Sequence, residues 1–136
     1  MADSRHRRGL LDTSVVVDLE RIDPAELPAE IAISAVTLAE LAAGPHATAD
    51  PAERARRQDR LQRAEATFEP LPFDGAAARA YGRVYAAVAA AGRKPRGPRA
   101  FDLLIAATAI AAELPVYTRN PGDFAELDDL LDVVAV

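Results

Sequence analysis

The chain has 136 residues, half of them hydrophobic, and carries a net charge of −5. This length fits one domain that can bury a core without disulfides or a structural metal. Cysteine is absent, which excludes disulfide frameworks, thiolate zinc sites and a cysteine nucleophile. No apolar run approaches the ~20 residues that a membrane span needs, and the start does not read as a signal peptide. We therefore expect a cytoplasmic protein.

The negative net charge argues against a nucleic-acid partner, because binding to phosphate is usually driven by basic side chains. The objection weakens if the acidic side chains gather where a cation neutralises them. The positions of the acids along the chain therefore matter more than their sum.

The chain begins with a polar, basic stretch, residues 1–8, which predicts a flexible arm before a single domain at residues 9–136. Within that domain, short apolar runs of the kind that form buried strands alternate with helical segments. The predicted strands are residues 9–12, 31–34, 69–73, 115–118 and 131–136. The two prolines in 69–73 weaken the prediction for that segment.

Helices are predicted between these strands, where polar caps, prolines and glycines mark their ends. They cover residues 15–22, 34–44, 51–68, 74–91 and 100–114, with a short final helix after the turn 120–123. Thr13 or Ser14 would cap the first helix. Short strands that alternate with helices predict an α/β fold of three layers (α/β/α) around a short, mainly parallel sheet.

Four acidic residues are predicted to lie near one edge of this sheet. Asp12 closes the first strand, and Glu40 lies about one turn into the helix after the second. Asp102 lies in the first turn of a strongly apolar helix, and Asp123 follows the strand 115–118 by a few residues. Because ligands of open parallel sheets bind beyond the carboxyl ends of the strands, all four can converge there.

Carboxylates crowded in this way repel one another, and a hard divalent cation such as Mg²⁺ or Mn²⁺ relieves the repulsion. Such a site suits phosphodiester hydrolysis by metal-activated water, which needs no side-chain nucleophile. Thr13, Ser14 and Asn120 could donate hydrogen bonds to water or phosphate. A zinc site is not favoured, because its usual ligands are scarce: the chain has no cysteine and just two histidines, His6 and His46.

Basic residues form two groups. The loop 93–99 contains no acid and directly precedes Asp102, so we expect it to guide phosphate, with Arg99 and also Arg119 as phosphate contacts. The arginines of helix 51–68 are diluted by acids, and we expect them to be ordinary solvated charge. The apolar stripe on helix 74–91 is expected to pack in the core, and part of it could receive a partner helix.

Four stretches of the sequence resemble the PIN-domain ribonucleases, and most closely the VapC-type toxins of type II toxin–antitoxin systems. They are residues 11–14 (Leu-Asp-Thr-Ser), 34–41, 101–107 and 118–124, in the same order and with similar spacing. Each motif is weak alone, whereas four in register are strong, and the resemblance covers nearly the whole chain.

The resemblance implies a Mg²⁺- or Mn²⁺-dependent endoribonuclease with a PIN-like fold. It also implies a homodimer silenced by a cognate antitoxin protein, with RNA as substrate and no membrane partner. The family's metal-binding and catalytic acids match Asp12, Glu40, Asp102 and Asp123. Its accompanying polar residues match Thr13 and Asn120.

Other interpretations stay open at this point. Each acid taken alone has an ordinary explanation as a helix cap, a turn residue or a surface side chain. The domain could be a catalytically silent PIN-like module that binds RNA or protein. A phosphotransfer enzyme fits less well: a haloacid-dehalogenase-type phosphatase would have a second Asp at position 14, which is Ser. A receiver domain would have a lysine after a late strand, whereas Lys94, the single lysine, lies in a loop.

Overall fold

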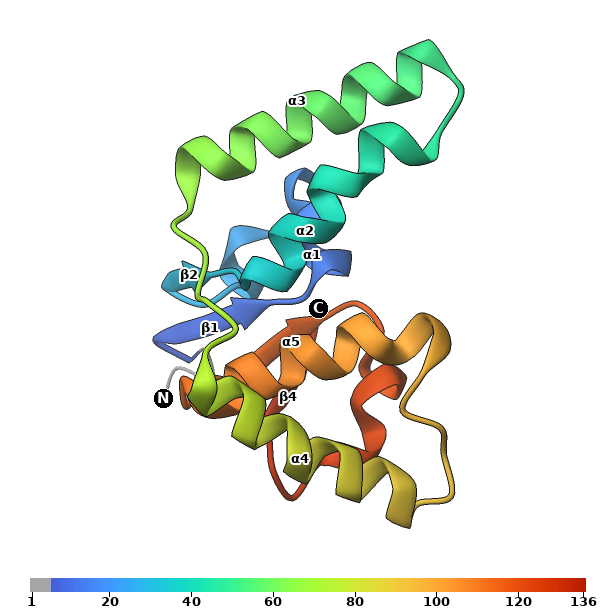
Figure 1. Ribbon diagram of the computed structural model, residues 1–136. Helices are drawn as coiled ribbons and strands as arrows, with labels where there is room; N and C mark the ends of the chain where they lie inside the picture. Colours follow the sequence, from blue (N-terminus) through green and yellow to red (C-terminus); the bar gives the residue numbers. More distant parts are fainter. Residues whose placement is uncertain (1–5) are drawn as a thin grey trace.

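The structure is a computed structural model of the chain, and it describes residues 6–136. A central sheet of four parallel strands runs in the order β2-β1-β3-β4 (Figure 1). The strands are β1 (Arg8–Leu11), β2 (Glu30–Ala32), β3 (Val116–Thr118) and β4 (Val133–Ala135). The predicted short parallel sheet is confirmed.

Five helices cover the two sides of this sheet. Figure 1 shows α4 and α5 side by side on one side of the strands, with α2 and α3 on the other. The helices are α1 (Thr13–Val17), α2 (Ala35–Ala43), α3 (Pro51–Thr67), α4 (Gly75–Ala90) and α5 (Ala100–Ala111). Short 3₁₀ segments connect them: η1 (Leu19–Arg21), η2 (Pro24–Glu26), η3 (Gly44–Ala47), η4 (Gly97–Arg99) and η5 (Pro121–Leu127). The α/β fold of three layers is confirmed.

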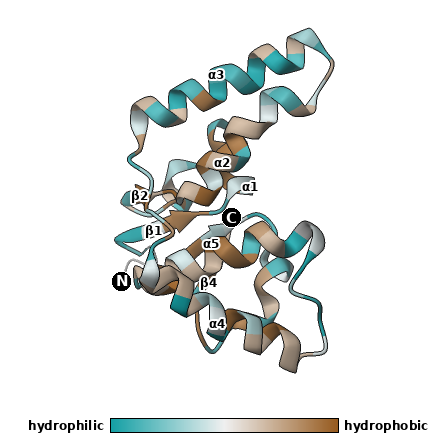
Figure 2. Ribbon diagram, viewed as in Figure 1, coloured by the Kyte–Doolittle hydropathy of each residue, from teal (hydrophilic) through white to brown (hydrophobic). Residues whose placement is uncertain are grey.

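Alternate residues of the central strands divide the core into two hydrophobic clusters. Leu10 and Val116 pack with α4 and α5, whereas Leu11 and Tyr117 pack with α1 on the other side. Successive side chains of a strand point to opposite faces, so strands buried on both faces must be apolar throughout. Figure 2 shows this apolar centre, in contrast to the mostly hydrophilic α3.

Gly9 is required where β1 passes Tyr117. A Cβ atom at this position would lie 2.5 Å from Cε1 of Tyr117, so any larger residue would displace a buried ring or the strand. The Tyr117 hydroxyl in turn accepts a hydrogen bond from the amide of His6 at 3.3 Å. β1 pairs directly with β3, with Leu10 opposite Val116 and Leu11 opposite Tyr117, so the two strands end side by side.

Three local predictions need correction. The helix predicted at 15–22 is divided into α1 and η1, because the backbone leaves the helical conformation at Asp18, the C-cap of α1. The strand predicted at 69–73 is wrong, because Leu71 forms just an isolated bridge to Ser34. Its neighbours Pro70 and Pro72 have no amide hydrogen to continue a ladder. The short final helix is the 3₁₀ segment η5.

The beginning of the chain also differs from expectation. Residues 1–5 of the predicted arm lie outside the described residues. β1 begins at Arg8, one residue earlier than predicted, and the Arg8 Nε lies 3.2 Å from Oε2 of Glu30 on the neighbouring strand. Within residues 6–136, no helix is both long and apolar enough to cross a membrane.

Candidate active site

Asp12 is the most firmly held of the four predicted acids. It follows β1 and stands at the N-cap of α1, the position predicted for Thr13 or Ser14, and just 3% of it is exposed. Oδ1 accepts the amide of Thr13 at 2.8 Å, and Oδ2 accepts the hydroxyls of Ser14 at 2.8 Å and Thr118 at 2.9 Å. A buried carboxylate is tolerated when several donors replace its water, as they do here.

Glu40 lies on the second turn of α2 and faces α1. Its Oε1 accepts a hydrogen bond of 2.7 Å from the hydroxyl of Thr13, which also lies 3.0 Å from the hydroxyl of Thr37. Burial raises the pKa of Glu40 above its usual value, the hydrogen bond from Thr13 lowers it, and the charge of Asp12 raises it again. Thr13 therefore joins the first acid to the second.

Asp102 lies in the first turn of α5 and is half-buried. Burial first, and then the negative charges of the other three acids, raise its pKa to about 7, while Arg99 acts in the opposite direction. Those three acids are Asp12, Asp123 and Glu40. Carboxylates influence one another in this way only at short range, so Asp12, Asp123 and Glu40 each lie near Asp102, and the four acids form a candidate site.

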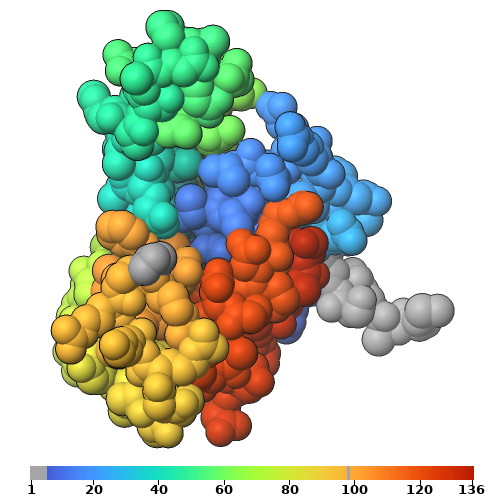
Figure 3. All heavy atoms as spheres, turned by 90° about the vertical axis from the view of Figure 1, so that its right-hand side faces the viewer, coloured from blue at the N-terminus to red at the C-terminus, as the bar shows by residue number. Residues whose placement is uncertain are grey.

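Four segments far apart in the sequence bring these acids together. Figure 3 looks at the edge where the strands end and shows the blue segment that follows β1, the teal α2, the orange start of α5 and the red η5 meeting there. Parallel strands all end at the same edge of a sheet, so residues that follow different strands meet in space. The convergence of the four acids expected from the sequence stays a prediction, and this arrangement of the segments supports it.

The site offers hard oxygen donors and an uncompensated negative charge, which fit a divalent cation. The charges of Asp12, Asp123 and Glu40 add to burial in raising the pKa of Asp102, as expected for such an excess of charge. Within residues 6–136, no group of three acidic or histidine side chains forms a ready metal cage. Mg²⁺ keeps several of its waters and takes one or two carboxylates directly, so the donor set fits a hydrated cation better than a fully enclosed one.

The other predicted site residues lie around the acids in different ways. Ser14 donates to Asp12, and its Oγ accepts the amide of Arg119 at 3.1 Å. The Arg119 Nε lies 3.5 Å from Oδ2 of Asp18. Asn120 acts through its backbone, donating to the Thr118 hydroxyl at 3.0 Å and accepting from the amide of Asp123 at 3.0 Å. Arg99 faces the acid Glu126 on η5, with 2.8 Å between Nη1 and Oε1.

Sequence reasoning missed three residues that support the site. Thr118 is fully buried and donates to Asp12, and Thr37 is equally buried beside Thr13. A polar residue that ends an apolar strand, as Thr118 ends Val116–Thr118, is a signal that could have found the first. Glu126 gave no such signal, because its partner Arg99 is 27 positions away.

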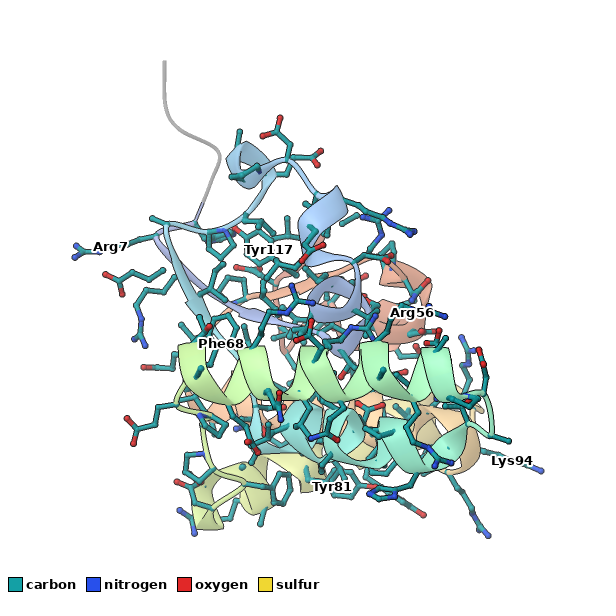
Figure 4. The ribbon with its side chains drawn as sticks, turned by 90° about the horizontal axis from the view of Figure 1, so that it is seen from above. Arg7, Arg56, Phe68, Tyr81, Lys94 and Tyr117 are labelled. Atoms are coloured by element: carbon teal, nitrogen blue, oxygen red, sulfur yellow. The ribbon has the colours of Figure 1, made fainter. Side chains whose placement is uncertain are left out.

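A cleft of about 940 Å³ opens beside the acids on the α3 side, with Thr13 and Glu40 in its wall. One face of α3 lines it, with residues at intervals of three and four along the helix. Figure 4 shows this helix from above, with Arg56 and Phe68 labelled near its opposite ends. The four arginines of that face are Arg56, Arg57, Arg60 and Arg63. The arginines that the sequence assigned to solvent therefore border the candidate site.

A family model described as the PIN domain matches residues 9–130 of the chain. The chain belongs to the PIN-domain family. Ribonuclease VapC5 of Mycobacterium tuberculosis is 41% identical over 128 residues, which are 92% of this PIN domain and 91% of that protein. Ribonuclease VapC8 of the same species is 40% identical over 102 residues, which are 74% of this PIN domain and 89% of that protein.

Solved structures agree with this assignment. A chain of the toxin–antitoxin complex VapBC-5 from Mycobacterium tuberculosis superposes with a TM-score of 0.84 at 39% identity. The match covers 96% of this PIN domain and 99% of that chain. A chain of VapBC2 from Rickettsia felis, solved with a DNA fragment from its promoter, superposes with a TM-score of 0.77 at 26% identity. That match covers 95% of this PIN domain and 98% of the other chain.

Proposed function

We propose that this PIN domain is an endoribonuclease that depends on Mg²⁺ or Mn²⁺ and acts as the toxin of a toxin–antitoxin pair. The observation that carries the proposal is that burial and the nearby charges of Asp12, Asp123 and Glu40 raise the pKa of Asp102 to about 7. Relatives named ribonuclease VapC, one of them similar over more than nine-tenths of both chains, support RNA as the substrate.

In this proposal Asp12, Glu40, Asp102 and Asp123 hold the cation. When bound, a divalent cation supplies activation of water and neutralisation of phosphate charge, the two needs of phosphodiester hydrolysis. The four carboxylates provide the negative charge that attracts such an ion. No residue has to form a covalent bond with the substrate.

The surrounding hydroxyls keep two of these carboxylates in place. Ser14 and Thr118 hold one oxygen of Asp12, and Thr13 holds Glu40. A carboxylate fixed in advance loses little freedom when it binds a cation, so these bonds favour binding. The roles of Ser14, Asn120 and Arg119 at the phosphate or its water stay predictions.

The cleft beside Glu40 gives the RNA strand a path to the acids. Arg60 lies in its wall, and no ion pair engages its guanidinium within residues 6–136. An arginine in this position can contact a phosphate next to the one that is cut. Basic side chains around an acidic centre also answer the objection raised by the net charge of −5.

The partner is proposed to be a cognate antitoxin protein, as in the toxin–antitoxin complexes to which this PIN domain is similar. A small neighbouring reading frame for a DNA-binding protein, whose product co-purifies with this chain, would support that. The homodimer and the cytoplasmic location are predictions, and light scattering on the purified chain would test the first.

The test of catalysis is cleavage of single-stranded RNA by the purified chain. We expect cutting with Mg²⁺ or Mn²⁺ and none with a chelator. Asp12→Asn and Asp102→Asn should each reduce the rate at least about 100-fold, because several kcal/mol of stabilisation depend on the cation. Asp129→Asn, which changes an exposed carboxylate elsewhere, is the matched control.

Cleavage that survives both substitutions would overturn the proposed site. The second candidate function is a catalytically silent module that binds RNA or protein. It would be favoured if the wild-type chain binds RNA without cutting it and if Asp12→Asn keeps its toxicity or regulatory effect in cells.

A further inference from the structure

A buried ion pair lies next to the four carboxylates and joins two segments of the site. Nη1 of Arg99 lies 2.8 Å from Oε1 of Glu126, and Nη2 lies 3.2 Å from Oε2, so the guanidinium meets both oxygens. The Glu126 side chain is 6% exposed and that of Arg99 is 16% exposed. An ion pair this buried is held in one geometry, unlike the exposed pairs elsewhere on the surface.

The same guanidinium also binds the backbone of a candidate metal ligand. Nη2 of Arg99 donates to the carbonyl oxygen of Asp123 at 2.6 Å. Arg99 ends η4, and Asp102 follows it by three residues in the first turn of α5. One side chain therefore connects the segment that carries Asp102 with the segment that carries Asp123.

Glu126 is set apart from the four acids by its partners. Burial acts to raise the pKa of Glu126, but the hydrogen bonds from Arg99 and the charges of Arg99 and Arg93 bring it below its usual value. Nε of Arg93 lies 3.2 Å from Oε1 of Glu126. This carboxylate is already neutralised by two arginines, so it anchors Arg99 and leaves the cation to the other four.

We propose that Arg99 is a positioning residue, which holds Asp123 at a fixed place relative to Asp102 through Glu126 and the Asp123 carbonyl, and so sets the affinity of the site for its cation. The inference rests on the proposed function. It replaces the direct phosphate contact that the sequence suggested for Arg99, because the structure already commits both of its terminal nitrogens.

Arginine is the side chain suited to this task. Its planar fork can meet both carboxylate oxygens and a carbonyl at once, whereas the ammonium group of lysine is a single point of charge. Arg99→Lys keeps the charge near Asp102 and loses the fork. That substitution therefore separates positioning from simple charge balance.

The experiment measures Mn²⁺ binding to the full chain by titration calorimetry, without RNA. We expect Arg99→Lys to weaken Mn²⁺ binding about tenfold, the size usual for residues that orient metal ligands. Glu126→Gln should weaken it less, and the double variant no more than Arg99→Lys alone, since the two residues act together. Arg93→Ala, which removes the half-exposed contact to Glu126, should change it less than about twofold.

A second measurement separates positioning from contact with the substrate. At saturating Mn²⁺, Arg99→Lys should cut RNA with a KM within about twofold of the wild-type value. Unchanged Mn²⁺ affinity together with a raised KM for RNA would overturn the inference and make Arg99 a phosphate contact. Circular dichroism and thermal melting of each variant verify that it is folded.

The outcomes distinguish this inference from the proposed function. If the wild-type chain binds Mn²⁺ but cuts no RNA, the proposed activity fails while the affinities of the variants still decide the role of Arg99. If the wild-type chain binds no Mn²⁺, both are wrong. Equal Mn²⁺ affinity in the wild type, Arg99→Lys and Arg93→Ala would overturn the positioning role alone.

Discussion

The two halves of the candidate site hold their carboxylates in opposite ways. On the side of α1 and α2, hydroxyls and an amide surround Asp12, and Thr13 binds Glu40. On the side of α5 and η5, burial and neighbouring charges raise the pKa of Asp102, and no hydrogen bond to its carboxylate offsets them within the described chain. On that side the Arg99–Glu126 ion pair holds the backbone carbonyl of Asp123.

The difference shows that one site can contain both an acid whose carboxylate is fully hydrogen-bonded and an acid whose carboxylate is not. The first half is preorganised because its donors replace water around the carboxylate. The second half carries repulsion that a cation would relieve, so we expect the metal-free protein to be destabilised there. Binding of a cation should therefore depend on both halves. In the metal-free protein, by contrast, loss of a carboxylate should change stability in opposite directions in the two halves.

The largest expected difference is in metal-free stability. Asp12→Asn should lower the free energy of unfolding by about 2 kcal/mol, because the new amide turns a donor toward the Ser14 and Thr118 hydroxyls. Asp102→Asn should raise it by about 1 kcal/mol after allowing for solvent screening, because a repelled charge disappears. Urea denaturation with a chelator measures both, and Asp129→Asn should stay within about 0.5 kcal/mol of wild type.

Equal destabilisation by Asp12→Asn and Asp102→Asn would contradict the comparison. It would mean that Asp102, like Asp12, is held by contacts that favour its charged form. A gain in stability for both variants would show instead that Asp12 also lacks adequate donors.

A pH series should show a somewhat smaller effect that belongs to the second half. The pKa of Asp102 is about 7 in the folded chain against a usual value of 3.8, so between these pH values the folded chain keeps a proton that the unfolded chain has released. Its contribution to stability is therefore largest below about pH 4, falls as pH rises toward 7, and is constant above. With a chelator present, we expect the wild type to lose about 1 kcal/mol relative to Asp102→Asn between pH 5 and 8.

Parallel stability profiles for wild type and Asp102→Asn over this range would show that Asp102 titrates normally. The matching expectation for the loaded site is weaker Mn²⁺ binding at lower pH, because protons compete with the cation for the same carboxylate. Calorimetric titrations at two pH values would measure it.

The smallest expected effect concerns the cleft that adjoins the first half. Arg60→Ala should raise the KM for RNA about twofold to threefold with little change in kcat, because it removes one phosphate contact and no ligand of the cation. The effect should shrink as salt increases. Arg83→Ala, which changes an exposed arginine on α4, is the control. An equal change in KM in both variants would show that the RNA does not pass along the cleft.

Local sequence patterns were sufficient for most of the architecture. The apolar runs around Leu10, Ile31 and Val116 predicted three of the four strands, and the fourth lies within 131–136. Two prolines overrode the apolar pattern near Leu71, and α1 proved shorter than its apolar pattern suggested. These errors arise where backbone hydrogen bonding, which a pattern of side chains does not report, limits an element.

The four acids could be selected from the sequence because each lies next to a strand end or within an apolar helix turn. Their supporting residues could not be selected in the same way. Thr118 acts on Asp12 across 106 positions, and Glu126 is distinguished from other acids only by its burial against Arg99. Such partners depend on the packing of whole elements.

The sequence by itself determined the alternation of strands and helices, the identity of the acids and their order along the chain. It did so because strand periodicity, caps and turn residues are local properties. Tertiary structure alone decided that arginines of α3 line the cleft beside Glu40 and that Arg99 pairs with Glu126. The physical reason is that the surroundings of a charged side chain, its burial and its nearest opposite charge, come from segments remote in the sequence.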